Sequence, residues 1–166
     1  MLRLSIMHIN IVRVRHRRLQ LMYNTQNLSL RTFFSPQILP VKSKFSQVSA
    51  IQKTVILTGW LEEHKAQNVL AFDVVNKNLC MDIVVILTAT SSRHAKGLAD
   101  GILEECTKQN FEYLRMEGYQ YGQWILVDLN DIVINIFQAG IRELYALETL
   151  WKGCPLLNGQ LATNTL

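Results

Sequence analysis

The sequence predicts an α/β fold in which helices flank a mixed five-stranded β-sheet. Apolar runs of strand length, at 82–88 and 132–137, alternate with longer segments whose apolar residues recur every three or four positions. Apolar residues make up 49% of the 166 residues and charged residues 18%, which indicates one domain with a buried core rather than global disorder. The expected order of elements is α-β-β-α-β-β-β-α.

The first half of the predicted domain contains one helix and two strands. Residues 46–64 carry apolar side chains at mixed three- and four-residue spacing, which predicts a helix. Residues 68–75 form the first expected strand, and the polar residues 76–78 form a turn. The second expected strand, 82–88, is apolar on both faces and should therefore lie inside the sheet.

The next helix is expected to start at Thr90-Ser91-Ser92, because serine and threonine hydroxyls can cap the free amides of a first turn. Its apolar residues follow the spacing of one buried helix face. These residues are Ala95, Leu98, Ala99, Ile102, Leu103 and Cys106.

The second half of the sheet is predicted to contain a short strand at 112–116 and a hairpin of strands 123–129 and 132–137. Asn130 and Asp131 tolerate positive φ and suit the tight turn between the last two strands. A last helix is expected over 139–151. The residues expected to face the core from it are Ile141, Leu144, Tyr145 and Leu147.

The net charge of +4 is divided unevenly along the chain. Residues 1–50 contain eight of the 17 basic residues and no acidic residue, whereas the remaining 116 contain nine basic and all 13 acidic residues. We therefore expect a basic leader at 1–45, an acidic domain at 46–154 and a flexible tail at 155–166. The leader composition fits a mitochondrial transit peptide, a basic tail that contacts RNA, or translation from an upstream start codon.

Cysteine usage indicates neither a disulfide framework nor a metal centre. Cys80, Cys106 and Cys154 are far apart and form no CxxC pair, so reduced thiols in a reducing compartment are expected. No apolar run reaches the roughly 18 to 20 residues that cross a bilayer, so no membrane partner is predicted.

Two groups of residues could carry chemistry. Ser91, Ser92, Arg93 and His94 could form an anion site at a helix start, although ordinary capping explains the same residues. Their hydroxyls and the histidine are too close on one helical turn to favour a nucleophile and base.

Asp73 and Asp82, on adjacent predicted strands, could share a magnesium ion as in nucleotidyl transfer. Solvated charges at the ends of the strands are the other explanation of these two carboxylates. Asn135 interrupts an apolar strand and is expected to point outward or to bond a neighbouring backbone group.

Aromatic and acidic residues gather near the C-terminus, in the pattern of a surface that binds a basic protein. Core packing of the aromatic residues explains part of the same pattern. The residues of interest are Glu117, Trp124, Asp128, Glu143, Tyr145, Glu148 and Trp151.

From about residue 52 to 153 the chain resembles the Iojap family of ribosomal silencing factors. Several separate motifs carry the resemblance in the same order and spacing. They are Thr90-Ser91-Ser92-Arg93-His94, Ala99-Asp100, Glu117-Gly118, Trp124, Val127-Asp128-Leu129, Asp131-Ile132-Val133, and Arg142 with Tyr145, Leu147, Glu148, Leu150 and Trp151. Ala89 and Asn135 depart from the family, which usually has glycine and histidine there.

The resemblance implies a nucleotidyltransferase-like fold without the catalytic carboxylates, no enzymatic activity, and no cofactor or metal. It implies binding to the large ribosomal subunit through the fourteenth large-subunit protein, uL14, which blocks subunit association and represses translation. The residues that it suggests for binding, partly interface and partly core, are Trp124, Asp128, Arg142, Tyr145, Glu148 and Trp151.

The alternative is a nucleotidyltransferase-like enzyme that uses Asp73 and Asp82 with a metal ion. We expect a bacterial cytoplasmic protein, or a mitochondrial matrix protein if 1–45 is a transit peptide. Direct DNA binding is not expected, and a homodimer is left open.

Overall fold

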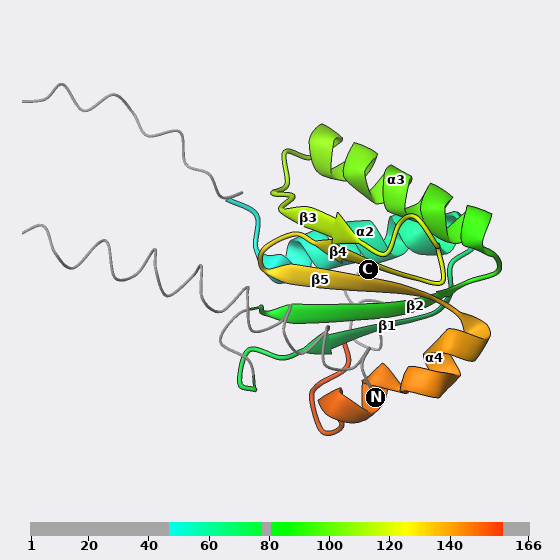
Figure 1. Ribbon diagram of the computed structural model, residues 1–166. Coiled ribbons are helices and arrows are strands. Elements are labelled where there is room, and N and C mark those ends of the chain that lie inside the picture. Colours follow the sequence, from blue (N-terminus) through cyan, green and yellow to red (C-terminus); the bar gives the residue numbers. More distant parts are fainter. Residues whose placement is uncertain (1–46, 78–80, 158–166) are drawn as a thin grey trace, which may run out of the picture. The chain divides into compact units, whose positions relative to one another are not determined.

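The computed structural model describes residues 47–77 and 81–157. The predicted leader at 1–45, Cys80 and the tail from residue 158 lie outside the described residues. In chain order the elements are α2 (Ala50–Glu63), β1 (Gln67–Asp73), β2 (Ile83–Ala89), α3 (Ser92–Lys108), β3 (Arg115–Glu117), β4 (Trp124–Asp128), β5 (Ile132–Gln138), α4 (Ala139–Tyr145) and the 3₁₀ helix η1 (Leu147–Trp151) (Figure 1).

The five strands form one mixed sheet in the order β1-β2-β5-β4-β3, which confirms the predicted fold class. β2 and β5 run parallel, and the other neighbouring strands are antiparallel. Every residue of β2 is buried, as expected for an apolar strand inside the sheet. On the edge of the sheet, Phe72 of β1 forms an isolated bridge with Leu156, and Asp73 N–H donates to Pro155 O at 2.9 Å.

Helices cover both faces of the sheet (Figure 1). α2 and α3 pack on one face, where Leu57, Leu61, Leu98 and Ile102 join the larger apolar core. α4 and η1 lie against the other face, over a smaller core of Phe72, Val74, Met81, Val84, Ile86 and Phe137. The α4 side therefore has less helix cover than the opposite side, and the residues of its margin are only half-buried.

α2 begins with a capping box. Ser49 Oγ accepts from Gln52 N–H at 3.3 Å, and Gln52 Oε1 accepts from Ser49 N–H at 3.4 Å. The helix therefore starts four residues later than the 46–64 prediction. A serine followed three positions later by glutamine was the sequence signal for this start.

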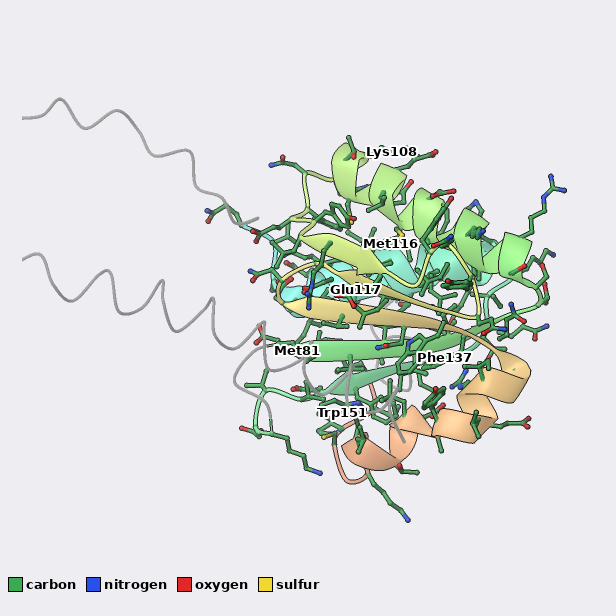
Figure 2. All side chains as sticks on the ribbon, viewed as in Figure 1. Met81, Lys108, Met116, Glu117, Phe137 and Trp151 are labelled. Atoms are coloured by element: carbon green, nitrogen blue, oxygen red, sulfur yellow. The ribbon has the colours of Figure 1, made fainter. Side chains whose placement is uncertain are left out.

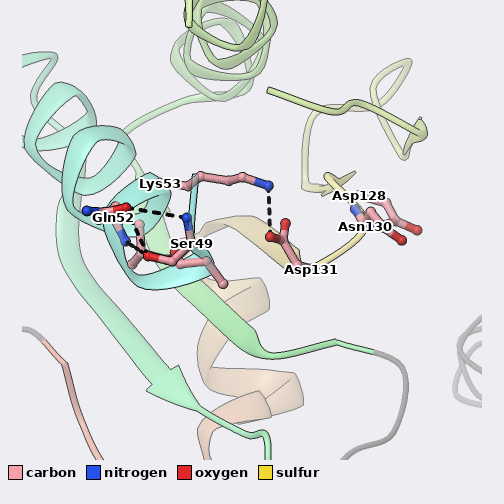
Figure 3. Close-up of polar contacts among 8 residues, drawn as sticks. Ser49, Gln52, Lys53, Asp128, Asn130 and Asp131 are labelled. Atoms are coloured by element: carbon pink, nitrogen blue, oxygen red, sulfur yellow. Dashed lines mark hydrogen bonds and ion pairs between the residues drawn. The ribbon is translucent and has the colours of Figure 1, made fainter. Parts of the chain in front are cut away.

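A buried ion pair fastens α2 to the β4–β5 hairpin (Figure 3). Lys53 Nζ lies 2.8 Å from Asp131 Oδ2, and the side chains are only 4% and 17% exposed. Asp131 O accepts from the backbone N–H groups of Asp82 and Ile83, so the same turn also holds the start of β2. Asp131 Oδ1 is buried and has no hydrogen-bond partner among the described residues.

The predicted hairpin is confirmed, since β4 and β5 are antiparallel and Asn130 has a positive φ of 79°. The predicted position of the short strand is wrong, because β3 covers Arg115–Glu117 rather than 112–116. Leu114 N–H bonds Asp128 O, which places this segment beside β4 but leaves only three residues in the ladder.

The single last helix predicted over 139–151 is wrong. Ala146 adopts a left-handed conformation, with φ 40° and ψ 50°, and ends α4 before η1 begins. Leu144, which was expected to face the core, is 73% exposed, so that part of the prediction is also wrong. Ile141 and Leu147 pack against the smaller core as predicted.

Candidate functional site

Three aromatic rings meet where β4 and β5 approach the end of α4. The ring of Trp124 lies 4.6 Å from that of Phe137 and 4.9 Å from that of Tyr145, measured between centroids. Phe137 is fully buried on the α4 side of the sheet (Figure 2), whereas Trp124 and Tyr145 are half-buried. We call Trp124, Phe137 and Tyr145 the aromatic platform. The buried ring supports two partly exposed rings, an arrangement suited to binding a partner.

Asn135 holds the indole of the platform in place. Trp124 Nε1 donates to Asn135 Oδ1 at 3.1 Å, and Asn135 Nδ2 lies 3.5 Å from Val85 O. Asn135 is 2% exposed, so the outward orientation considered for it is wrong, and the bond to a backbone group is confirmed. Sequence reasoning missed its role beside Trp124, although an amide in an apolar strand was the signal that a buried polar partner was needed.

Arg142 and Glu148 form an internal brace. Arg142 Nε donates to Glu148 Oε1 at 2.5 Å, and Arg142 Nη1 donates to Asn68 O and Thr88 Oγ1, both at 2.8 Å. The guanidinium thus ties α4 and η1 to β1 and β2. The side chains of Arg142 and Glu148 are 12% and 26% exposed, so the pair is largely enclosed by the protein.

Asp128 and Trp124 stand at opposite ends of β4, about 13 Å apart along the strand. The Asp128 side chain is 3% exposed, accepts from Asn130 N–H at 3.0 Å and lies 3.3 Å from Arg115 Nε. This carboxylate therefore shapes the hairpin turn and is not part of the platform. Charge reversal at Asp128 would disturb the turn as well as any contact with a partner.

Trp151 packs against the smaller core from η1 (Figure 2). Its indole Nε1 is buried without a hydrogen-bond partner among the described residues. Of the six residues predicted to bind a partner, the structure brings Trp124 and Tyr145 into contact and places Arg142 and Glu148 in the brace.

The start of α3 is capped as predicted, with Ser91 Oγ accepting from His94 N–H at 3.1 Å. Thr90 N–H donates to His94 Nδ1 at 3.2 Å, which leaves Nε2 to donate to His64 O at 3.0 Å. His94 therefore joins the start of α3 to the end of α2. Ser92 and Arg93 are exposed.

Asp73 ends β1 and pairs with Ile83, the first residue of β2. Asp82 lies at a bend just before β2, where its backbone O accepts from Val74 N–H and its N–H donates to Asp131 O, both at 2.8 Å. Asp73 Oδ1 also accepts from Val75 N–H at 3.1 Å.

Within residues 47–77 and 81–157, no group of three or more histidine, cysteine, aspartate or glutamate side chains could hold a metal ion. None of the helices in this part of the chain is both long and apolar enough to cross a membrane.

The comparisons with known proteins agree on one family. The family model described as "Ribosomal silencing factor during starvation" matches residues 47–165. A ribosomal silencing factor from Haemophilus influenzae is 40% identical over 91 residues, covering 55% of this chain and 89% of the relative. A ribosomal silencing factor from Bacillus subtilis is 29% identical over 115 residues, covering 68% of this chain and 98% of the relative.

The fold is also that of a crystal structure of a protein from Chromobacterium violaceum, with a TM-score of 0.62 and 24% identity. The likeness covers 64% of this chain and 88% of that one.

Proposed function

Since the chain belongs to the family of ribosomal silencing factors, we propose that it binds the large ribosomal subunit through its uL14-type protein and sterically blocks association with the small subunit. Binding rather than catalysis carries this function, and the result is repression of translation. The aromatic platform is the observation that supports it most directly, because Trp124 and Tyr145 are half-buried rings that pack on the buried Phe137 and on each other.

The proposed contact combines apolar area with negative charge. Leu144, 73% exposed, and the exposed Glu143 precede Tyr145 on α4. Residues 51–166 contain nine basic and 13 acidic residues, so the folded part is acidic. Ribosomal proteins are commonly basic, so charge complementarity would speed the encounter while the platform supplies the buried contact.

The six predicted residues take different parts in this proposal. Trp124 and Tyr145 contact the partner. Arg142 and Glu148 keep α4 and η1 in position, so they act through the platform rather than at it. Asp128 and Trp151 support the hairpin and the smaller core.

Affinity for isolated subunits tests the partner. The purified full chain should bind isolated large subunits and purified uL14-type protein, and it should not bind small subunits. Trp124→Ala should weaken binding by at least about tenfold, because a buried aromatic anchor contributes about 2 kcal/mol or more. Tyr113→Ala, which removes a 43% exposed ring from the connection before β3, is the matched control and should bind like the wild type.

Equal affinity of the Trp124 and Tyr113 variants would remove the platform from the proposal. Tight binding to large subunits without affinity for uL14 would move the contact to another ribosomal component.

The alternative is a metal-dependent nucleotidyltransferase using Asp73 and Asp82, and it is not favoured because residues 47–77 and 81–157 contain no group of three or more side chains that could hold a metal ion. Calorimetry with nucleoside triphosphates and magnesium would detect it as heat of binding that Asp82→Asn abolishes.

We propose the bacterial cytoplasm for the location, or the mitochondrial matrix if residues 1–45 are removed after import. Mass spectrometry of the mature N-terminus distinguishes the two. Size-exclusion chromatography with light scattering would detect a homodimer.

A further inference from the structure

The loop between β3 and β4 is firmly braced against the first turns of α3 (Figure 1). Lys96 Nζ donates to Gln120 O at 2.9 Å and lies 5.5 Å from the ring centroid of Tyr119. Tyr119 Oη donates to Asp100 Oδ2 at 2.8 Å, and this bond raises the pKa of Tyr119 above its ordinary value. The loop is thus held from both its backbone and its side chains.

Glycine at position 122 allows a close approach that completes this brace. Its φ is +65°, and a Cβ there would lie 2.9 Å from Ser92 O and 3.0 Å from Ser92 Cβ. Gly122 N–H bonds Gly118 O at 3.1 Å, and Gly122 O accepts from Gln138 Nε2 at 3.0 Å. Residues on either side of this contact, Tyr121 and Arg93, are therefore brought to the same corner of the protein.

Tyr121 stands out from this fixed loop. It is 73% exposed and makes no ring contact or hydrogen bond with the described residues. Arg93 is also exposed and has no ion pair within 47–77 and 81–157. The exposed ring and the exposed guanidinium each lie one residue from the Gly122–Ser92 contact, so the backbone that carries them is already ordered and less entropy is lost on binding.

Among the described residues, Arg93 is the cation of this corner without a partner. Residues 90–100 and 117–123 contain Arg93 and Lys96 together with Asp100 and Glu117. Asp100 accepts from Tyr119 Oη, Glu117 pairs with Arg115, and Lys96 donates to Gln120 O, which leaves the Arg93 guanidinium available. The backbone N–H groups of Ser92 and Arg93, at the positive end of α3, have no hydrogen-bond acceptor in the described part of the chain. A phosphate would therefore be attracted by the Arg93 guanidinium and by these amides.

We propose that Tyr121 and Arg93 form a contact for single-stranded RNA, in which an unpaired base stacks on the Tyr121 ring and Arg93 contacts the adjacent phosphate. An aromatic ring accepts any base, and a guanidinium suits a phosphate oxygen. The pairing of a ring with a cation fits RNA better than it fits a basic ribosomal protein, which Arg93 would repel.

The proposed RNA contact lies close in the chain to the aromatic platform. Tyr121 is three positions before Trp124, so at most about 10 Å of chain separates their Cα atoms. Trp124 faces the α4 side of the sheet, whereas the loop with Tyr121 packs on α3, so a protein docked on the platform would leave Tyr121 at the edge of the contact, within reach of neighbouring ribosomal RNA. The assignment of ribosomal RNA as the source of the unpaired base rests on the proposed function, whereas the affinity for single-stranded RNA does not.

Fluorescence anisotropy of the full chain with a labelled, unstructured RNA oligonucleotide tests the contact. Raised salt reduces the non-specific contribution of the basic leader, while stacking persists. Tyr121→Ser should weaken binding by about 5- to 150-fold, from the usual contribution of one stacked base. Tyr121→Phe keeps the ring and should bind like the wild type.

Arg93→Gln should weaken binding and reduce the slope of log affinity against log salt by about 0.7, since one phosphate contact to a single strand is lost. Tyr113→Ser and Lys152→Gln remove an exposed ring and an exposed cation elsewhere and should leave both quantities unchanged.

RNA affinity that is the same in the Tyr121→Ser, Tyr113→Ser and wild-type proteins would overturn the inference. So would loss of large-subunit binding by Tyr121→Ser with unchanged affinity for RNA, because the ring would then contact a protein. If the chain binds no large subunits but Tyr121 still governs RNA affinity, the proposed function fails and the RNA contact stands.

Discussion

Removal of Lys53 should destabilise the protein far more than removal of an equally close surface lysine. Lys53 Nζ and Asp131 Oδ2 are 2.8 Å apart with the lysine 4% exposed, whereas Lys108 Nζ and Glu105 Oε1 are 2.7 Å apart with the lysine 62% exposed. Lys53→Met leaves the Asp131 carboxylate largely buried and uncompensated. Breaking a buried pair costs about 3–5 kcal/mol, and the 17% exposure of Asp131 favours about 3 kcal/mol.

Urea unfolding followed by circular dichroism measures this difference. Lys53→Met should lose about 3 kcal/mol of unfolding free energy, and Lys108→Met should keep the wild-type midpoint because solvent screens its pair. In the cycle with Asp131→Asn, the double variant should be more stable than the sum of the single losses predicts by about 1–3 kcal/mol. Equal losses for Lys53→Met and Lys108→Met, or strict additivity in the cycle, would refute the view that burial determines the contribution of the pair.

Two further predictions concern α3. Gly101→Ala should cost about 1–3 kcal/mol of unfolding free energy because the new Cβ would lie 2.1 Å from the Trp60 ring, whereas Gly97→Ala places its Cβ in open space and should stabilise the protein by about 0.5–1 kcal/mol. Thermal unfolding of both variants measures the difference, and a stabilising effect of Gly101→Ala would contradict the prediction. Burial raises the pKa of Cys106 to about 11, so alkylation of its thiol should be much slower at pH 8.5 than alkylation of the half-buried Cys154, and it should accelerate as the pH rises toward 11. Peptide mass spectrometry measures both alkylation rates, and equal rates at pH 8.5 would contradict this prediction.

Local signals predicted the parts of the fold that local chemistry determines. Asn130 supplies the positive φ of the hairpin, and Ser91 caps α3, as expected from their residue types. Ala146 shows the limit of such signals, because alanine has no intrinsic preference for the left-handed conformation that ends α4. The ion pair between Arg142 and Glu148 spans the turn at Ala146. The periodicity of apolar residues carries no information about such a contact, so it could not indicate that the helix ends there.

The candidate site was predicted in composition but not in arrangement. Trp124 and Tyr145 were singled out by residue type, yet their contact depends on packing between β4 and α4. The orientation of Asn135 depends on Trp124 across the sheet and on Val85 50 positions earlier in the chain. From the sequence alone Lys53 would be assigned to the surface, because its partner Asp131 is 78 positions away in the chain. Long-range pairing of polar side chains is therefore what the sequence left undetermined.

Light scattering during the joining of purified large and small subunits measures the consequence of platform binding. The wild-type chain, added first to the large subunit, should prevent the rise in scattering. Trp124→Ala should allow joining at protein concentrations where the wild type and Tyr113→Ala still prevent it. Unimpaired inhibition by a folded Trp124→Ala variant would contradict the claim that silencing depends on the aromatic platform.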